Sequence, residues 1–208
     1  MLIATEGRTA LPGGHRQFAV VNLRVAPLGR GEGFTFVDAV VGGAIPRNYI
    51  GSVQAGIEET MARGGVHGFP VVDVTVECFD GKFHSVDSSD MAFKTAASLG
   101  FRDAMAAAGV VVLEPISLLK VQVPSAHQGD VMGDITSRRG RVHGTNAIEH
   151  GDQEVEALVP ASELQRYAID LRSITAGCGR FSVQHSHYDV LPAHLIDKTK
   201  QGLPPAQH

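Results

Sequence analysis

The second half of the chain switches between two hydrophobic periods, and this switching most restricts the folds it can adopt. Apolar residues recur at every second position in some segments, as in strands, and at every third or fourth position in others, as in helices. The segments follow in the order strand, helix, strand, strand, helix, strand, at residues 116–123, 128–138, 142–148, 154–159, 162–174 and 181–188. This order predicts a ferredoxin-like β-α-β-β-α-β domain.

The first half predicts a separate set of strands and helices. Alternating apolar residues indicate strands at 21–25, 34–36 and 72–78. In the last strand, alternate side chains from Val72 to Cys78 are expected to face the core, where a free cysteine behaves as a small apolar residue. Asp80-Gly81 is expected to form a turn after this strand.

Two helices complete the first half. Pro46 suits the first turn of a helix, and an apolar stripe continues to Met61 before Gly64-Gly65 ends it. Ser88-Ser89-Asp90 supplies groups that can cap a second helix, and Gly109 is its stop signal.

Composition excludes several classes of protein. Two cysteines cannot form a disulfide framework or a zinc site of four thiolates, and no apolar run approaches the length of a membrane-spanning helix. Charges occupy the place of a signal peptide's apolar core, so we expect a cytoplasmic protein with no membrane partner. The net charge of −4 is shared equally by residues 1–113 and the remaining residues, so RNA contact would need local basic clusters.

Nucleotide and metal motifs are absent from the sequence. It contains neither G-x-x-x-x-G-K-[ST] nor H-E-x-x-H, and its cysteines are not paired. His185-Ser186-His187 would place two imidazoles on one face of a strand, but no third ligand lies nearby in sequence. A metal site and an ordinary exposed sheet face both stay open for these histidines. We expect no cofactor and no metal in this chain.

The polar segment from His84 to Asp90 allows three interpretations. Its histidine, serine and aspartate residues are the types found in a hydrolase triad, although such triads usually draw on distant parts of a chain. The serines and aspartates also suit hydrogen bonding to the backbone at a helix start. The third interpretation is a loop that contacts a partner through Lys82 and His84.

Ser137-Arg138-Arg139-Gly140-Arg141 places three guanidinium groups at a predicted helix end. A guanidinium matches phosphate bidentately, which favours a phosphate-binding cluster. Cations are also stabilised at the negative end of a helix dipole, so a solvated helix end is an equal alternative.

Several segments resemble one family in the correct order. Val40-Val41-Gly42-Gly43-Ala44-Ile45-Pro46 resembles the V-G-G-x-I-P signature of elongation factor G. The resemblance continues at residues 69–74, 83–94, 113–115, 129–134, 137–140 and 171–173. It spans residues 5–192 and covers the fourth and fifth domains of that five-domain translational GTPase.

The resemblance implies an α+β protein of two domains. Residues 1–113 are expected to form a βαβ fold like domain 2 of ribosomal protein S5, with a left-handed crossover, which is rare. Residues 114–195 are expected to form the ferredoxin-like sandwich, and residues 196–208 a disordered tail. GTP and Mg²⁺ belong to the family's N-terminal GTPase domain, which this sequence lacks, so we expect no enzymatic activity from this chain.

The family also implies a role in translation. The tip of its fourth domain enters the decoding centre of the ribosome and holds the tRNA–mRNA duplex during translocation, and its fifth domain touches large-subunit RNA. The expected partners are therefore 16S and 23S rRNA and the tRNA–mRNA duplex, bound by a monomer. The tip residues implied are Gly14, His15, Arg16, Gln17, Phe18, Lys82, His84 and Ser85, and those facing large-subunit RNA are Arg138, Arg139 and Arg141.

Two departures from the family pattern leave the role open between translocation and ribosome recycling. Arg16 stands where the family usually has glycine, and Phe18 where it has tyrosine. One alternative is a stand-alone enzyme on the S5-like fold, with residues 82–90 as active site and a deep pocket around His84. Another is a protein that binds ribosomes without GTP.

Overall fold

The computed structural model shows a mixed α+β protein, as predicted. Contacts divide the chain into two compact units, of which unit 1 comprises Met1–Val110 and Lys198–His208, and unit 2 comprises Val111–Asp197. Each unit has one four-stranded sheet and its own hydrophobic core. The structure describes residues 3–8, 17–65, 67–148 and 151–200.

The sheet of unit 1 is mixed, with strand order β1-β2-β4-β3. Its strands are β1 (Ile3–Arg8), β2 (Val20–Pro27), β3 (Phe34–Asp38) and β4 (Val74–Lys82). Strands β3 and β4 are parallel and the other pairs antiparallel. Helix α1 (Arg47–Arg63) connects the two parallel strands, which gives a βαβ unit. The sequence pattern did not predict β1.

The two helices of unit 1 begin and end close to their predicted positions. Pro46 is the N-cap of α1, one position before the first turn. Ser89 caps α2 (Asp90–Ala108), because its Oγ accepts a hydrogen bond of 3.1 Å from the backbone N–H of Ala92. Gly64 and Gly109 end the helices in the left-handed conformation, which glycine adopts without a Cβ clash.

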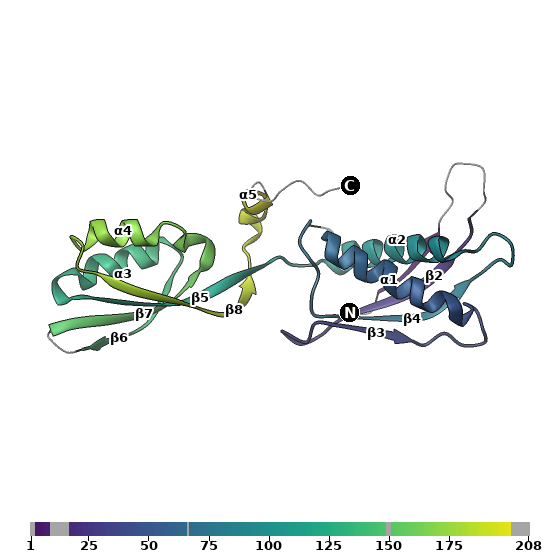
Figure 1. Cartoon of the computed structure of the whole chain (residues 1–208), viewed down its shortest axis with the longest axis horizontal. Helices are drawn as coiled ribbons and strands as arrows, with labels where there is room; N and C mark the ends of the chain where they lie inside the picture. The colour runs from purple at the N-terminus through teal and green to yellow at the C-terminus, as the bar shows by residue number, and fades with distance from the viewer. Residues whose placement is uncertain (1–2, 9–16, 66, 149–150, 201–208) are drawn as a thin grey trace. The chain divides into compact units, whose positions relative to one another are not determined.

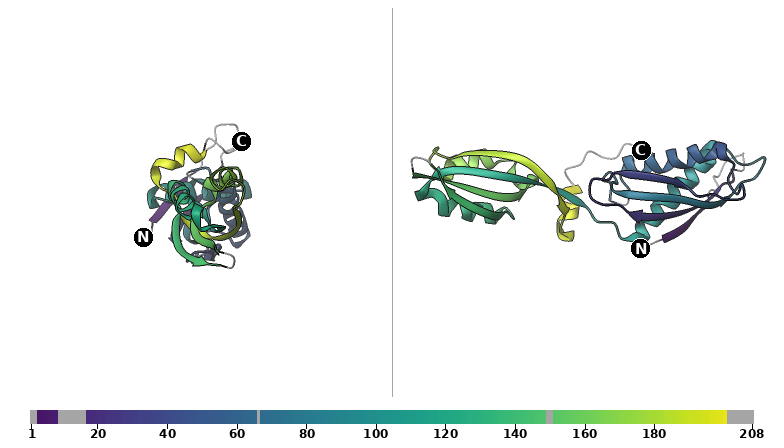
Figure 2. Two further views of the ribbon diagram at one scale, coloured as in Figure 1. Left: turned by 90° about the vertical axis from the view of Figure 1, so that its left-hand side faces the viewer. Right: turned by 90° about the horizontal axis from the view of Figure 1, so that it is seen from below.

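Helices α1 and α2 lie side by side on one face of this sheet. They are above the strands of unit 1 in Figure 1, and the right-hand view of Figure 2 shows the unit from below. Alternate residues of β2 and β4, including Leu23, Val76 and Cys78, are fully buried against them. Burial raises the pKa of the Cys78 thiol to about 12. The predicted core position of Cys78 is confirmed.

Strand β4 begins two residues later than predicted. Asp73 has a φ of +59°, and its carboxylate accepts backbone N–H bonds from Gly31 (3.0 Å) and Gly33 (2.9 Å). The backbone is therefore turned just before Val74. Val72 does not face the core as predicted, because it precedes this turn and 54% of it is exposed.

The predicted turn at Asp80-Gly81 is wrong, because both residues lie within β4. Gly81 pairs with Val21 in the β2–β4 ladder. A Cβ on Gly81 would lie 2.4 Å from the Val20 carbonyl oxygen and 2.6 Å from the Ile45 side chain. Glycine here permits a close approach within the sheet, a use that sequence alone cannot distinguish from a turn.

Unit 2 has the predicted order of elements. Its sheet is antiparallel throughout, with strand order β6-β7-β5-β8, and the elements follow the chain as β5, α3, β6, β7, α4 and β8. This is the ferredoxin-like arrangement. Their bounds are β5 (Leu113–Pro124), α3 (Gln128–Ser137), β6 (Arg141–Ala147), β7 (Asp152–Pro160), α4 (Tyr167–Ile174) and β8 (Arg180–Val190).

Two helical segments of the structure differ from the predictions. Helix α4 is shorter than predicted, because Ala161–Leu164 forms a separate 3₁₀ turn before it. Ile196–Lys200 forms a short helix, α5, where we expected the disordered tail to begin, and residues 201–208 lie outside the described residues. No helix in the described ranges is long and apolar enough to cross a membrane.

A β-bulge in β8 separates two histidines that were expected to share a face. His185 pairs with Ser117, and His187 pairs with the adjacent residue Ile116, so Ser186 is the extra residue. Residues paired across two strands point to the same face, and the neighbouring residues Ser117 and Ile116 point to opposite faces. The imidazoles of His185 and His187 therefore also point to opposite faces. The expected pairing of these imidazoles on one face is therefore wrong.

Gly56 is predicted to control the approach of α2 to α1, since a Cβ there would lie 2.3 Å from the Lys94 carbonyl oxygen. We expect Gly56→Ala to lower the free energy of unfolding by about 1–3 kcal/mol, because the helices must separate. Gly51→Ala on the same helix meets nothing within 4 Å and is expected to raise it by up to about 1 kcal/mol. Urea unfolding followed by circular dichroism measures both, and equal effects would contradict the close contact.

The two cysteines are predicted to differ in reactivity. Because the thiolate is the reactive species, the raised pKa and burial of Cys78 should protect it from a thiol-specific disulfide reagent near pH 8. Cys178 is exposed and should react in the native protein. The Cys178→Ser variant keeps Cys78 as its one thiol. While folded, it should therefore release no chromophore from the reagent until urea unfolds it, and rapid release before that would contradict the buried position of Cys78.

Candidate functional site

The candidate site lies at the end of unit 1 where β2 begins and β4 ends. Val20 at the start of β2 pairs with Lys82 at the end of β4. The chain beyond each strand therefore leaves the sheet at the same place. Phe18, next to β2, donates its backbone N–H to the carbonyl oxygen of Asp87 in the loop between β4 and α2, at 2.9 Å. This loop, residues 83–89, and Gln17-Phe18 are called the loop end below.

Ser88 joins the two parts of the loop end. Its Oγ accepts a hydrogen bond of 2.9 Å from the backbone N–H of His84 and donates one of 2.6 Å to the carbonyl oxygen of Phe18. The sequence predicted only a local backbone contact for Ser88, and no signal in the sequence points to Phe18, 70 residues away.

His84 combines a fixed ring nitrogen with an exposed side chain. Its Nδ1 lies 3.3 Å from the backbone nitrogen of Asp87, 3.4 Å from that of Val86 and 3.2 Å from Asp87 Oδ2. In the neutral ring Nδ1 accepts the N–H bonds, and in the protonated ring it donates to the carboxylate. Both forms use Nδ1 inside the loop, which leaves Nε2 for an outside partner. The side chain is 56% exposed.

The other predicted tip residues divide between exposed, half-buried and undescribed positions. Lys82, Phe18 and Ser85 are exposed, whereas Gln17 is half-buried. Val86, which was not predicted, is 82% exposed at the same loop. Gly14, His15 and Arg16 lie outside the described residues.

The loop 83–89 has the hydrogen bonds of a structural turn rather than those of a hydrolase triad. The Oγ atoms of Ser88 and Ser89 bond backbone groups. The ring of His84 bonds its own loop, and its half-exposed side chain does not form the floor of a deep pocket. These contacts favour the interpretation of backbone hydrogen bonding at a helix start over that of a hydrolase triad.

The three arginines of the 137–141 cluster have different environments. Arg138 is 16% exposed and bonds Asp134 at 2.8 and 3.1 Å, Asp170 at 2.7 Å and the Glu163 carbonyl oxygen at 2.9 Å. Its guanidinium also lies 5.2 Å from the ring centre of Tyr167. Hydrogen bonding to Asp134, and then to Asp170, raises the pKa of Arg138. Arg138 therefore ties α3 to α4.

Arg139 and Arg141 are less enclosed. Arg139 has a φ of +61° and forms a bidentate salt bridge with Glu114, a carboxylate that is 8% exposed. Arg141 is exposed and forms no salt bridge with a described residue. Of the three guanidinium groups, that of Arg141 is the most available to an outside anion.

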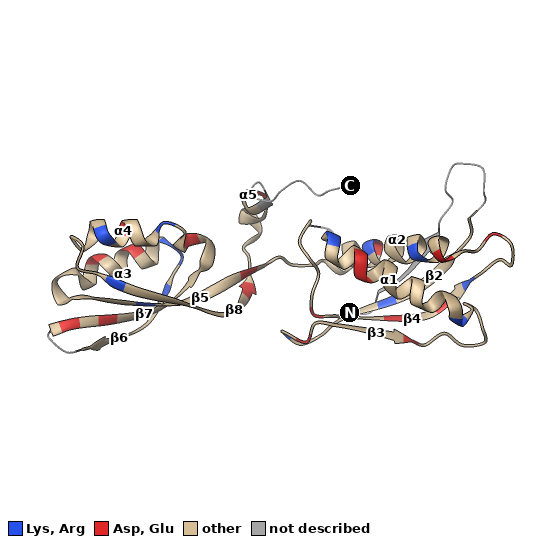
Figure 3. Cartoon of the chain, in the orientation of Figure 1, with Lys and Arg blue, Asp and Glu red and all other residues tan. Residues whose placement is uncertain are grey.

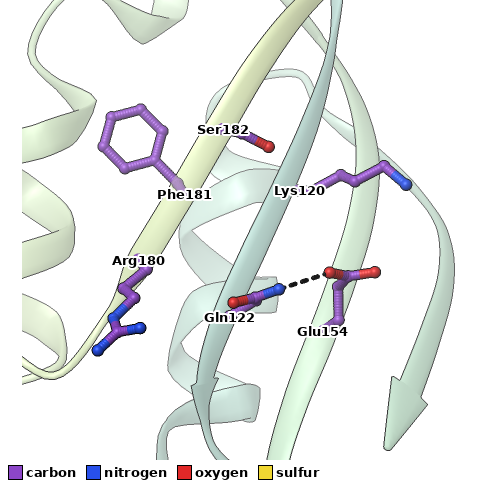
Figure 4. A pocket seen from close by; sticks show the side chains of 6 residues that line it. All are labelled: Lys120, Gln122, Glu154, Arg180, Phe181 and Ser182. Carbon is purple, nitrogen blue, oxygen red and sulfur yellow. Dashed lines mark hydrogen bonds between the residues drawn. The ribbon is translucent and has the colours of Figure 1, made fainter. Parts of the chain in front are cut away.

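The sheet of unit 2 carries a pocket of about 170 Å³, on the face opposite to its core. Figure 4 shows Gln122 donating to Glu154 at its centre, with Oε2 at 2.9 Å. Lys120 forms a salt bridge with Glu156. Arg180 points from β8 on the other side and, among the described residues, forms no salt bridge. The pocket is too mixed in charge to indicate one ligand.

A second pocket, of about 220 Å³, lies near the start of β5 in the same unit. Half of its lining is apolar, including Ile116 and Leu158, and the other half is charged or polar: Glu114, Arg139, Arg141, His187 and Asp189. Figure 3 shows acidic and basic residues mixed over the described parts of both units, without a large region of one sign. No group of three or more described His, Cys, Asp or Glu residues is placed to hold a metal ion.

Comparison with known proteins places both units in one family. Residues 7–109 match the family model "Elongation factor G, domain IV", and residues 111–199 match "Elongation factor G C-terminus". Together the two matches cover nearly the whole chain.

Individual relatives agree with these matches. "Elongation factor G-like" proteins of two Mycobacterium tuberculosis strains are each 47% identical to the chain over 190 residues. The alignment covers 91% of this chain and 27% of each relative, so the chain spans about a quarter of their length. A crystal structure from Thermus thermophilus has a TM-score of 0.77 and 38% identity, over 96% of this chain and 30% of that one.

Arg138 and Arg141 are predicted to differ in their effect on stability. Arg138→Ala should lower the free energy of unfolding by about 2–3 kcal/mol, because it leaves the half-buried Asp134 and Asp170 without their shared cation. Arg141→Ala should change it by less than about 0.5 kcal/mol, as expected for an exposed side chain. Urea unfolding measures both variants, and a similar loss in each would contradict their assigned environments.

Proposed function

The chain belongs to the elongation factor G family, and on this premise we propose that it forms the ribosome-contacting part of a translation factor. The observation that supports this most strongly is the loop end of unit 1. It exposes His84 on a loop that is hydrogen-bonded to the start of β2, so a polar contact group is held on a stiff support. Such a surface suits contact with a partner better than it suits bond-making chemistry.

The partner proposed for the loop end is the tRNA–mRNA duplex in the decoding centre, next to 16S rRNA. With Nδ1 occupied inside the loop, Nε2 carries a proton in both ring forms, so His84 can donate a hydrogen bond to acceptor atoms of phosphate, ribose or base edges. Lys82 adds a cation beside it. RNA recognition of this kind depends on a few placed groups, which is compatible with a net charge of −4.

Unit 2 is proposed to contact 23S rRNA. Arg141 is the leading residue for this contact, because Arg138 and Arg139 bond carboxylates of the same unit. A guanidinium that is free of internal salt bridges can bind a phosphate bidentately. The second pocket, which Arg141 borders, lies next to this contact.

The action proposed for the chain is steric. The loop end would occupy the path of the tRNA–mRNA duplex and hinder its return after movement, during translocation or ribosome recycling in the cytoplasm. GTP and Mg²⁺ do not fit the residues present, because the sequence has no phosphate-binding loop and the described part has no metal-holding cluster. In the full-length family member they would belong to the GTPase domain, which neither matching family model covers.

Ribosome co-sedimentation of the chain tests the loop end. His84→Ala is expected to weaken binding by about tenfold, the effect of losing one hydrogen bond to a charged group. His67→Ala is the matched control, because this half-buried histidine lies in the connection that follows the C-terminal end of α1, outside the loop end. Circular dichroism checks that both variants are folded.

The same variants in a full-length factor test the steric role. His84→Ala should slow single-round translocation or recycling, while His67→Ala should not. If His84→Ala and Lys82→Ala both bind and function as the wild type does, the loop end is not the contact surface.

A further inference from the structure

We infer that Ser88 is a positioning residue, which sets the orientation of His84 toward its partner. This inference rests on the proposed function, since it assumes that His84 contacts something outside the chain. The sequence suggests only that Ser88 helps to start a helix, and the family comparisons assign it no role.

The hydroxyl of Ser88 uses its donor and its acceptor capacity at once. It accepts from the backbone N–H of His84 and donates to the carbonyl oxygen of Phe18, at 2.9 and 2.6 Å. The first bond closes the turn around His84. The second crosses 70 residues of sequence and attaches that turn to the segment leading into β2. The hydroxyl therefore fixes His84 relative to the sheet.

Backbone bonds and one side chain complete this frame. Ser88 donates its own N–H to the His84 carbonyl oxygen at 3.1 Å, and Phe18 donates to the carbonyl oxygen of Asp87 at 2.9 Å. The hydroxyl of Tyr49 on α1 lies 3.5 Å from the carbonyl oxygen of Ser88 and donates to it. Among the described side chains, the Ser88 hydroxyl is the one that bonds both His84 and Phe18.

A different residue caps α2, so Ser88 is not needed for the start of this helix. Ser89, and not Ser88, accepts the N–H bond from Ala92 that caps α2. Removing the Ser88 hydroxyl would therefore leave the start of the helix intact. It would leave the His84 N–H and the Phe18 carbonyl without this partner, at a site where water can compete, so only the remaining bonds would hold the turn and it would open more often.

The ring of His84 would lose its orientation through this movement. Its Nδ1 is held by the N–H groups of Val86 and Asp87, and its ring packs edge-on against Phe18 with centroids 6.4 Å apart. These contacts occupy Nδ1 and leave Nε2 as the ring nitrogen for a partner, and they last only while the turn and Phe18 keep their relative positions. The Ser88 hydroxyl maintains these positions, together with the backbone bond from Phe18 to Asp87.

Amide hydrogen exchange of the free chain tests the positioning without any ribosome. Ser88→Ala should speed exchange at the His84 amide by at least about tenfold and also speed it at Phe18. Ser88→Thr keeps the hydroxyl and should restore both rates. Ser89→Ala is the neighbouring control, which should speed exchange at Ala92 but not at His84. Unchanged exchange at His84 in Ser88→Ala would overturn the inference.

Ribosome co-sedimentation tests whether Ser88 acts through His84. Ser88→Ala should weaken binding by about three- to tenfold, and Ser88→Thr should restore it. In the His84→Ala background, Ser88→Ala should cause no further loss, because the group that it positions is already gone. Full additivity of the two losses would overturn the inference, since Ser88 would then act independently of His84.

The two experiments separate the inference from the proposed function. If exchange at His84 responds as expected but His84→Ala itself does not weaken ribosome binding, Ser88 still positions His84, and the proposed function fails instead. If Ser88→Ala does not fold, Ser88→Cys provides a variant of similar volume with a much weaker hydrogen-bonding group. Exchange at His84 should then be faster in Ser88→Cys than in Ser88→Thr, and equal rates would overturn the inference.

Discussion

The antiparallel pairing of β2 with β4 is the constraint on which unit 1 depends. These are the two inner strands of its sheet, and their alternate residues form the core beneath α1 and α2. On the other face the pairing is reinforced by the Arg24–Glu77 salt bridge at 2.6 Å. The same ladder ends with Val20 opposite Lys82, so the buried core also fixes where the loop end leaves the sheet. The packing of this core therefore also determines where the loop that carries His84 begins.

In unit 2 a single cation has a comparable organising role. Arg138 connects α3 to α4 through Asp134 and Asp170 and covers the ring of the fully buried Tyr167. A guanidinium suits this position because it donates in several directions in one plane and stays charged when partly buried. Since this arginine is bonded within the unit, the surface proposed for RNA must rely on exposed cations such as Arg141.

The proposed function needs stiffness more than charge. A loop that blocks a path must resist displacement, and the hydrogen bonds between the loop 83–89 and Phe18 would supply this resistance. From the residues alone, sequence analysis gave Lys82 and His84 as partner contacts in one of three interpretations, and the family resemblance added Ser85. Sequence analysis missed Ser88 as a link to Phe18, because a serine before a helix suggests a cap equally well.

The sequence by itself determined the order of elements in unit 2 and the approximate ends of α1 and α2, because periodicity and capping depend on neighbours within a few residues. Only the tertiary structure decided that Gly81 lies within a strand, that a bulge separates His185 from His187, and that Arg138 bonds Asp170. Each of these outcomes depends on partners far away in sequence. A local pattern shows which bonds a side chain can form, and the fold decides which partners come within reach.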